Sequence, residues 1–376
     1  MSLSIFLPDL RGGGAERVCT TLSKEFNTRG YDVEFVLINR RGKYLDEVPD
    51  EVSVVSLDAP EIPGYHALGA VPGLTRYLRR RKPDTLLSML TRANLVAVMA
   101  TGLSRVETRL ILSERNHISA RSEHTSDIRR KVSPKLIRLL YPRADGFIAV
   151  SEGVALDLAT VGHLRLEEIT TIYNPTVRDD VLEKKHEPVD HPWFTEDGPP
   201  VIIGVGSLTE QKDFPTLIEA FATLRKKRPC KLIILGKGNQ RDRLESLISE
   251  LGIKNDVELA GFKSNPYAYI AAADVFALSS AWEGLPNVLI EALACGTPVV
   301  STDCPSGPRE ILQDGKYGPI VSVGNHVALA QSIETMIDNP TPEEHLLSRA
   351  TDFRPEPIAS QYLDVLFPKQ VGNLSM

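Results

Sequence analysis

The chain has 376 residues, of which 42% are hydrophobic and 24% are charged, and its formal net charge is −6. This composition is typical of a soluble globular protein, and the length is sufficient for two domains of ordinary size. The acidic balance and the lack of a recognised nucleic-acid motif exclude a nucleic-acid-binding protein from the favoured classes. No apolar run approaches the roughly 18 to 20 residues that a membrane-spanning helix needs.

The first residues and the cysteines indicate the compartment. Met1–Pro8 is a short apolar run followed by Asp9 and Arg11, whereas a secretory signal has a basic opening and a longer apolar core. We therefore expect a first β-strand there. The four cysteines are scattered without metal-ligand or redox spacing, which favours small buried side chains in a reducing cytoplasm.

Short runs rich in Val, Ile and Leu alternate with longer helical patterns through the first half of the chain. Such alternation predicts a parallel sheet covered by helices on both faces. The predicted strands are 3–7, 33–38, 85–90, 109–113, 146–150 and 169–173, and the predicted helices are 15–29, 68–81, 93–102 and 152–161.

The alternation stops at Asn174-Pro175 and restarts at Val201, after a polar and charged stretch. This break predicts a linker over 174–200 between an N-terminal domain at 1–173 and a C-terminal domain at 201–345. Two doubly wound units imply a cleft, with ligands at the carboxyl ends of the strands. In the second half the predicted strands are 201–205, 231–235, 257–259, 274–278 and 298–301, and the predicted helices are 214–227, 239–251, 286–295, 326–337 and about 357–366.

Basic residues gather in the first half of the chain. Residues 1–173 hold 24 Lys and Arg against 21 Asp and Glu, and the remainder holds 19 against 28, so we expect the first half to face an anionic partner. Ser133 can cap a helix that has Pro134 at its first position. This helix would be amphipathic and basic, which fits an anionic lipid surface, although a core-packing helix with a solvated basic face explains the same residues. Its relevant side chains are Lys135, Leu136, Arg138, Leu139 and Leu140, and a second basic cluster is Arg76 with Arg79–Lys82.

Two glutamates eight residues apart flank the start of an apolar helix. Glu283 falls in a Gly/Pro loop, and Glu291 lies about one turn into the helix. Pro286 suits the first helical turn, where its missing N–H costs nothing. The free N–H groups of residues 287–289 would form an anion site strengthened by the helix dipole. Because Asn287 and Glu291 share a helix face, the segment predicts a site for a nucleotide whose diphosphate carries a group to be transferred.

Glycine-rich loops follow the first strand of each half. A phosphate could lie against the N–H groups of Gly12–Gly14, although a plain tight turn explains these residues too. Gly204 and Gly206 close the first strand of the second half, and a similar loop follows residue 235. Neither of these two loops has the third glycine of a dinucleotide-binding fingerprint, which argues against an oxidoreductase.

The run Glu-Gly-Leu-Pro-Asn-Val from Glu283, with Glu291 and the following Ala-Cys-Gly-Thr-Pro-Val-Val, resembles the donor site of family 4 glycosyltransferases. These are retaining enzymes with two Rossmann-like domains in the GT-B architecture. The resemblance covers nearly the whole chain and is more specific in its second half. It implies an α/β fold of two doubly wound domains facing across a cleft, with a C-terminal tail at 346–376 whose helix crosses back to the first domain.

The resemblance also implies a role for each donor-site residue. Glu291 would accept hydrogen bonds from the ribose hydroxyls, and Glu283 would lie toward the transferred sugar. Lys212 would hold the leaving diphosphate and stabilise its developing charge. The N–H groups that complete this diphosphate site belong to Asn287, Val288 and Leu289.

Two positions depart from the family pattern. Many relatives have an arginine where this chain has Ser207, so a single formal cation, Lys212, would remain on the diphosphate. Many relatives also have a histidine that faces the sugar at a strand end in the first domain. Arg115 takes that place here, and His117 lies two residues further on.

Three further residues enter the candidate donor site by resemblance. Gly13 and Gly14 match a Gly-Gly-x-Glu-Arg pattern in the loop that faces the donor phosphates. Phe262 follows a strand whose loop approaches the nucleotide base in the family. An aromatic side chain after a buried strand is equally well explained as part of the core.

These features predict a retaining glycosyltransferase that moves a hexosyl or N-acetylhexosaminyl group from a nucleotide-diphosphate donor, with a UDP-sugar favoured. The acceptor would be a glycan linked to polyprenyl diphosphate, in surface polysaccharide or glycoprotein glycan assembly. We expect no metal cofactor, because the family needs none and the chain has no Asp-x-Asp at a strand end and no His/Cys cluster. The protein would be cytoplasmic and peripheral at the anionic inner membrane surface. The alternatives are a nucleotide-sugar-binding protein without turnover, and a GT-B phosphorylase or epimerase.

Overall fold

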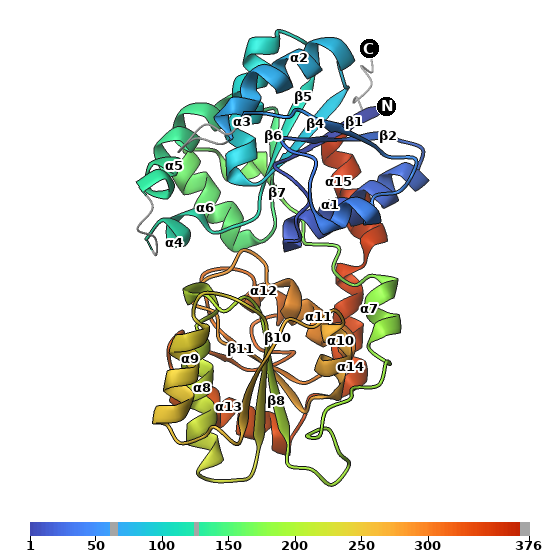
Figure 1. Ribbon diagram of the computed structural model, residues 1–376. Coiled ribbons are helices and arrows are strands. Elements are labelled where there is room, and N and C mark those ends of the chain that lie inside the picture. Colours follow the sequence, from blue (N-terminus) through green and yellow to red (C-terminus); the bar gives the residue numbers. More distant parts are fainter. Residues whose placement is uncertain (61–66, 124–127, 369–376) are drawn as a thin grey trace, which may run out of the picture. The chain divides into compact units, whose positions relative to one another are not determined.

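The computed structural model describes residues 1–60, 67–123 and 128–368. The chain divides into two compact units, one formed by Met1–Pro175 with Pro355–Met376 and the other by Thr176–Arg354 (Figure 1). Two predicted boundaries differ from this division. Residues 176–200, expected in a linker, belong to the second unit, and that unit extends to Arg354 rather than to residue 345.

The first unit contains a seven-stranded parallel sheet in the order β3-β2-β1-β4-β5-β6-β7. Its central strands carry continuous apolar runs because helices cover both faces. The short edge strand β3 was not predicted. The strands are β1 (Ser2–Leu7), β2 (Asp32–Leu37), β3 (Ser53–Ser56), β4 (Thr85–Met89), β5 (Arg109–Glu114), β6 (Gly146–Ala149) and β7 (Ile169–Thr171).

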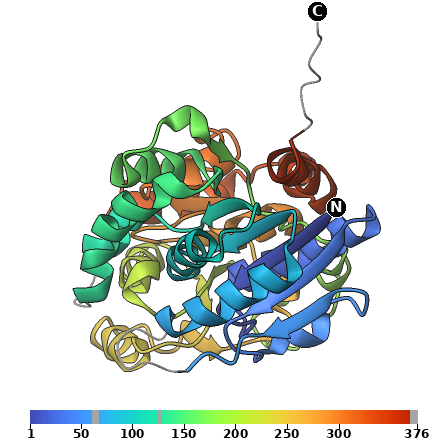
Figure 2. The same ribbon diagram turned by 90° about the horizontal axis from the view of Figure 1, so that it is seen from above.

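The last helix of the chain, α15 (Pro355–Leu366), belongs to the first unit and packs beside α1 (Figures 1 and 2). Tyr362 is fully buried, and its ring lies 6.4 Å from that of Phe26. The Arg29 guanidinium donates to the Glu356 carbonyl at 2.7 Å. The other helices of this unit are α1 (Gly14–Thr28), α2 (Val71–Arg81), α3 (Thr91–Ser104), α4 (Ile118–Glu123), α5 (Ile128–Leu140) and α6 (Glu152–Gly162), with short 3₁₀ helices at Lys43–Glu47, Leu68–Ala70, Tyr141–Arg143 and Leu166–Glu168.

The second unit contains a six-stranded parallel sheet in the order β10-β9-β8-β11-β12-β13. Its strands are β8 (Val201–Val205), β9 (Lys231–Leu235), β10 (Val257–Gly261), β11 (Val275–Leu278), β12 (Val299–Thr302) and β13 (Ile320–Val321). Its α-helices are α7 (Asp179–Lys184), α8 (Phe214–Arg225), α9 (Arg241–Glu250), α10 (Pro266–Ala272), α11 (Asn287–Cys295), α12 (Pro308–Ile311), α13 (His326–Asp338) and α14 (Glu343–Ala350), with 3₁₀ helices at Glu210–Lys212 and Thr351–Phe353.

The basic helix of the first unit begins earlier than predicted. Because α5 starts at Ile128, Pro134 lies inside the helix and Ser133 is not its N-cap. Ile137 is buried, whereas Leu136 and Leu139 are 40% and 63% exposed. One apolar residue of α5 therefore packs inward while two leucines stay at the surface. In the part of the chain that the structure describes, no helix has the length and apolar character to cross a membrane.

Candidate functional site

The two glycine loops that follow β8 and β9, at Gly206 and Gly236, are in direct contact with each other. The Gly206 N–H donates to the Leu235 carbonyl at 2.9 Å. Gly236 has a φ of +150°, and a Cβ at this position would lie 1.8 Å from the Gly206 carbonyl oxygen. The Lys212 side chain runs over Gly206, where a Cβ would lie 3.0 Å from Lys212 Cε. Glycine is therefore required at residue 236, and the backbone at Gly206 is covered by a lysine.

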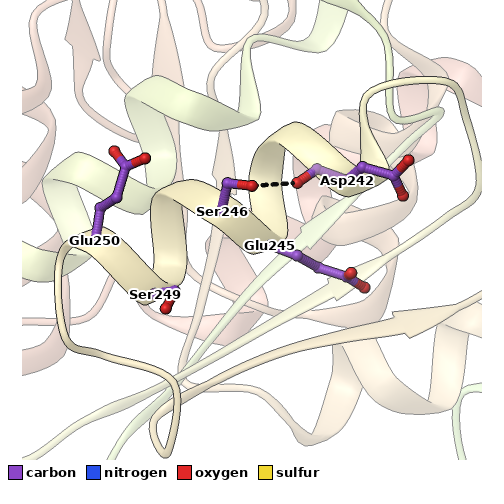
Figure 3. Close-up of a pocket in the computed structure, with 5 residues that line it drawn as sticks. All are labelled: Asp242, Glu245, Ser246, Ser249 and Glu250. Atoms are coloured by element: carbon purple, nitrogen blue, oxygen red, sulfur yellow. Dashed lines mark hydrogen bonds between the residues drawn. The ribbon is translucent and has the colours of Figure 1, made fainter.

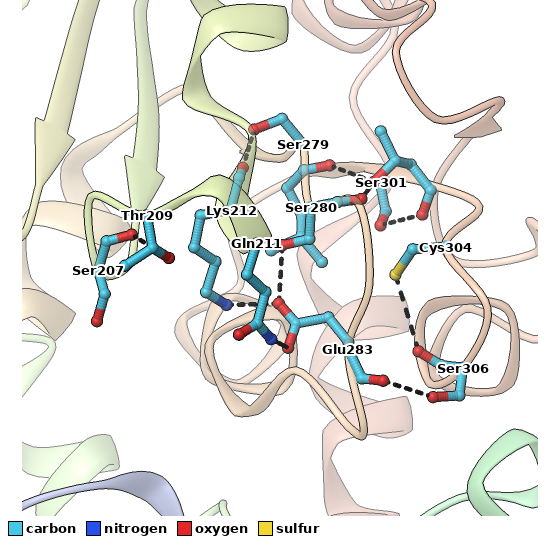
Figure 4. Close-up of polar contacts among 12 residues, drawn as sticks. Ser207, Thr209, Gln211, Lys212, Ser279, Ser280, Glu283, Ser301, Cys304 and Ser306 are labelled. Carbon is cyan, nitrogen blue, oxygen red and sulfur yellow. Dashed lines mark hydrogen bonds and ion pairs between the residues drawn. The ribbon is translucent and has the colours of Figure 1, made fainter. Parts of the chain in front are cut away.

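A buried ion pair joins the first of these loops to the Gly/Pro loop before α11 (Figure 4). Lys212 Nζ lies 2.5 Å from Glu283 Oε1, and the two side chains are 17% and 7% exposed. Ser280 Oγ donates to the same carboxylate oxygen at 2.7 Å, and Gln211 Nε2 lies 3.3 Å from the other oxygen. These donors take the place of water around the carboxylate and so offset the cost of burying it.

The backbone around Glu283 is also fixed. Ser306 Oγ donates to the carbonyls of Glu283 and Gly284 at 2.7 and 3.1 Å. Gly307 has a φ of +93°, and a Cβ there would lie 2.5 Å from Pro286 Cδ. Because both sides of the loop are tightly packed, the Glu283 carboxylate has little freedom to move away from Lys212.

Helix α11 starts one residue later than predicted, with Pro286 as its N-cap. The Leu289 N–H donates to the Pro286 carbonyl at 3.0 Å. The prediction that this N–H is free for an anion was therefore wrong, and the helix N-terminus offers at most the first two positions, Asn287 and Val288. Glu291 lies further along the same helix and is half-buried.

Sequence reasoning missed a group of residues that borders α11. Thr176 Oγ1 donates to Asn287 Oδ1 at 3.3 Å. The Arg178 side chain is only 15% exposed, and its charge interacts with that of Glu291. Both residues fall in the polar stretch that was interpreted as a linker, and its composition gave no signal of their position.

The remaining predicted residues of the second unit lie at the surface. Ser207 is exposed, and its carbonyl accepts from the Thr209 N–H at 2.8 Å. Phe262 is 59% exposed, and Lys237 Nζ lies 5.9 Å from the centre of its ring. The interpretation of Phe262 as a core residue was therefore wrong. An exposed aromatic ring beside a cation is a surface on which a planar group can stack.

In the first unit, the glycine loop at Gly12–Gly14 lies against a carboxylate of the same chain, that of Glu16. Gly13 is the N-cap of α1, and a Cβ there would lie 2.4 Å from Glu16 Oε2. Burial raises the pKa of Glu16, although hydrogen bonds from the backbone N–H groups of Glu16 and Gly13 act in the opposite direction. A carboxylate thus occupies the place at Gly13 and Gly14 where the sequence predicted a donor phosphate.

Arg115 is also engaged inside the first unit. It is 8% exposed, and its guanidinium donates to Asn174 Oδ1 at 2.5 Å and to the Tyr362 hydroxyl at 3.4 Å. These bonds tie the end of β5 to α15. His117 Nδ1 accepts from the Ala120 N–H at 3.3 Å, which makes it a cap for α4. The predicted sugar contact of Arg115 stays a prediction.

The described residues offer little for a metal or a reactive thiol. They contain no group of three or more His, Cys, Asp or Glu that could hold a metal ion. All four cysteines are buried, as predicted, and none of them is in a disulfide. Burial raises the pKa of the Cys19 and Cys295 thiols to about 12, so they stay protonated near neutral pH.

A surface hollow on α9 is lined by two serines and three carboxylates, a lining that would repel a diphosphate (Figure 3).

In comparisons with known proteins, each half of the chain matches its own family model. The family model described as "Glycosyl transferase 4-like domain" matches residues 13–175, and the model described as "Glycosyl transferases group 1" matches residues 188–352. Among solved structures, HepE of Anabaena in complex with UDP and glucose has a TM-score of 0.76 at 22% identity, with 97% of this chain and 99% of that chain covered. The galactosyltransferase WaaB has a TM-score of 0.75 at 20% identity over 98% and 99% of the two chains. These likenesses show the fold.

Sequence relatives cover the chain at nearly full length. An N-acetylgalactosaminyltransferase of Campylobacter jejuni, named for its action on N-acetylgalactosamine-N,N'-diacetylbacillosaminyl-diphospho-undecaprenol, is 33% identical over 90% of both chains. A second N-acetylgalactosaminyltransferase of the same organism, named for a longer undecaprenol-diphosphate-linked glycan, is 25% identical over 97% of this chain and 98% of its own. With both halves matched by family models and one relative a third identical along nine-tenths of its length, the chain belongs to the family 4 glycosyltransferases of GT-B fold.

Proposed function

We propose that the protein is a retaining N-acetylhexosaminyltransferase that uses a UDP-linked donor and a glycan acceptor linked to polyprenyl diphosphate. The observation that carries this proposal is the buried Lys212–Glu283 pair, set between the Gly206 loop and the loop that leads into α11. The names of the two Campylobacter relatives support the N-acetylhexosamine and the lipid-linked acceptor. The HepE complexes with UDP support the nucleotide.

The ion pair gives Lys212 and Glu283 complementary tasks. A bound diphosphate would draw the ammonium of Lys212, which neutralises the charge that develops as the bond from sugar to phosphate breaks. The Glu283 carboxylate would remain beside the sugar and stabilise positive charge at its anomeric carbon. Since water is largely excluded from both side chains, each charge acts more strongly than it would at the surface.

The rest of the donor would be bound along α11 and the loop after β10. The N-terminal end of α11 would attract the diphosphate through its dipole. Glu291 would accept hydrogen bonds from the ribose hydroxyls. The exposed Phe262 ring and its neighbour Lys237 would receive the uracil base, because stacking on an aromatic ring is favourable for any nucleobase.

The acceptor side of the proposal rests on α5. Leu136 and Leu139 are exposed beside the exposed cations Lys135 and Arg138, while Ile137 anchors the helix from its other side. Such a surface fits the interface of an anionic membrane, where each cation contributes on the order of 1 kcal/mol. The enzyme would thus meet a lipid-linked acceptor at the membrane surface while its donor arrives from solution.

Nucleotide selectivity provides the first test. Thermal unfolding is measured with UDP, GDP, ADP or NAD, for the wild type and for Glu291→Ala. A ligand at 100 times its dissociation constant stabilises by about 2.7 kcal/mol, so binding is readily detected. We expect stabilisation by UDP alone, and its loss in the variant. Stabilisation by GDP instead, or by none of the nucleotides, would contradict the proposed donor.

Turnover is tested separately. The wild type is incubated with UDP-N-acetylgalactosamine, UDP-N-acetylglucosamine or UDP-glucose and with a short polyprenyl-diphosphate-linked glycan. We expect transfer from an N-acetylhexosamine donor, with the α-configuration of the donor kept in the product. Binding of UDP without transfer from any donor would favour the nucleotide-sugar-binding protein without turnover.

A further inference from the structure

The segment from Thr176 to Lys185 begins the second unit and borders α11 along its length. At one end, Thr176 Oγ1 contacts Asn287 Oδ1 at 3.3 Å. At the other end, Lys185 Nζ donates to the Ala294 carbonyl at 3.2 Å. Helix α7 packs against α11 between these two contacts. The segment therefore supports the helix that carries the proposed ribose-binding carboxylate, Glu291.

Arg178 is the charged residue at the centre of this support. Its Nε lies 2.8 Å from Asp180 Oδ1, and its Nη2 donates to the Tyr267 hydroxyl at 3.1 Å. Two more bonds reach the second oxygen of Asp180 at 3.2 Å and the Thr176 carbonyl at 3.5 Å. The guanidinium is thus fixed by its own segment and by Tyr267 of α10. Because the side chain is only 15% exposed, these bonds hold it in one orientation with little competition from water.

The charge of Arg178 acts on Glu291. Burial alone would lower the pKa of the Arg178 guanidinium, but Tyr267, Asp180 and Glu291 together raise it above its usual value. Asn287, Glu291 and Cys295 are spaced four residues apart and share one face of α11. Thr176 contacts this face at Asn287, and at its other end the Cys295 thiol donates to the Tyr267 carbonyl at 3.6 Å. Opposite charges placed near each other in this way favour the ionised form of the carboxylate. Lys185, whose Nζ donates to the Ala294 carbonyl at 3.2 Å, is a second cation of the segment beside this part of α11.

We propose that Arg178 is a positioning residue for the donor nucleotide, which holds Glu291 ionised and oriented to accept hydrogen bonds from the ribose hydroxyls. This inference rests on the proposed donor site. A charged acceptor at a fixed place strengthens a ribose contact, because hydrogen bonds to an ionised group are about twice as strong as neutral ones. Arg178 supplies the fixed counter-charge without touching the nucleotide itself.

The alternative is that Arg178 has a purely structural role and only links α7 to α10. The two roles differ in what they change. A structural residue affects the folding of the unit, whereas a positioning residue affects the binding of ligands that carry ribose hydroxyls. Binding of UDP and of 2′,3′-dideoxy-UDP to the full chain therefore separates them. Isothermal titration calorimetry gives both affinities, and a thermal melt of each variant reports on folding.

We expect Arg178→Met to weaken UDP binding about tenfold and to leave the weaker binding of dideoxy-UDP nearly unchanged. Arg178→Lys keeps the charge but loses the planar fork, and should weaken UDP binding by about threefold. Arg225→Met is the matched control, because it removes an Arg–Asp pair of the same 2.8 Å length elsewhere in the second unit. It should change neither affinity. If Arg178→Met does not fold, the lysine variant still decides the question.

A double-mutant cycle with Glu291→Gln completes the experiment. We expect the double variant Arg178→Met, Glu291→Gln to bind UDP about as weakly as Glu291→Gln alone, because the two residues act through one contact. Additive losses, or an equal loss for dideoxy-UDP, would show that Arg178 does not act through Glu291. A loss in Glu291→Gln with none in Arg178→Met overturns this inference and leaves the donor site intact. A wild type that does not bind UDP overturns both.

Discussion

Helices α1 and α11 both begin after a loop rich in Gly or Pro at the end of a parallel strand. They differ in whether an acidic side chain lies at the helix N-terminus. At α1 the Glu16 carboxylate folds back over the N-cap Gly13. At α11 the N-cap is Pro286, and the first turn contains no acidic residue. A helix N-terminus that holds its own anion repels a second one. Of these two helix ends, α11 therefore fits a diphosphate better, because its first turn has no acidic side chain that would repel one.

The cations of the two regions follow the same division. Arg17 of α1 lies over the Tyr44 ring, 5.3 Å from its centre, and Arg115 is bonded to Asn174. In the second unit, Lys212 is paired with Glu283, a partner that a diphosphate could replace. A glycine run before a helix therefore does not by itself define an anion site. What defines it is whether the protein has already satisfied the N–H groups and cations there.

The largest effect should come from the ion pair of the second unit. Glu283→Gln keeps the size of the side chain but removes its charge, and we expect turnover to fall by about 10² to 10³, with UDP affinity changed by less than about threefold. In contrast, Glu16→Gln at α1 should leave turnover within about twofold of the wild type. Steady-state kinetics with the active donor measure both. A similar loss of turnover in the two variants would erase the distinction between the regions.

The second largest effect concerns the backbone N–H groups. Val288 of α11 and Ala15 of α1 are each the second residue of their helix, and proline is accepted at that position in α8, where Pro215 stands. Val288→Pro removes an N–H from the proposed diphosphate site, so we expect UDP affinity to fall by about tenfold, in line with the ~1.5 to 3 kcal/mol of a hydrogen bond to a charged group.

Ala15→Pro removes the equivalent N–H of α1 and should leave UDP affinity unchanged. Calorimetric titration with UDP and with uridine measures the contrast, because uridine lacks the diphosphate and should not distinguish Val288→Pro from the wild type. If uridine binding falls as much as UDP binding, the proline acts through the shape of the helix rather than through the lost N–H.

The central strands and long helices of both units could be predicted from the sequence, because their apolar runs are continuous. Strands β8 and β9 were predicted at their observed bounds. The edge strand β3 could not be predicted, since its four residues Ser-Val-Val-Ser are exposed or only half-buried and leave a weak pattern. Helices α10 and α14 were also missed, because both are short and have a proline at their first residue or immediately before it, which equally marks a turn.

For the candidate site, the sequence indicated the residues but not their partners. The spacing of Glu283 and Glu291 placed one in a loop and the other in a helix, as observed. It could not show that Glu283 pairs with Lys212, since 71 residues separate them. Glu16 is three residues after Gly13, a spacing that fits a capping carboxylate, and this signal was available. Arg178 offered none, because a lone arginine in a polar stretch has no periodic pattern around it.

A smaller effect is expected where the chain departs from its family. Ser207 is exposed on the loop that leads to Lys212, and its carbonyl accepts a hydrogen bond from the Thr209 N–H. Ser207→Arg would add a second cation to the proposed diphosphate site, and we expect UDP affinity to rise by about threefold. Ser249→Arg adds the same charge to the acidic surface of α9 (Figure 3) and should have no effect. A rise in both variants would indicate general charge attraction rather than a local contact.

The smallest effect tests the anion already held by α1. Burial raises the pKa of Glu16 above its usual value, so the folded protein binds this proton more tightly than the unfolded chain. The stabilisation linked to that proton is complete below the unfolded pKa and is lost as the pH rises through the folded pKa. Glu16→Gln cannot titrate, so the unfolding free energy of the wild type, relative to that of the variant, should decrease from about pH 4 toward neutrality. Urea unfolding of both proteins across this range measures the difference. A difference that grows with pH would mean that the backbone N–H groups outweigh burial, and that α1 holds its carboxylate as a charged cap.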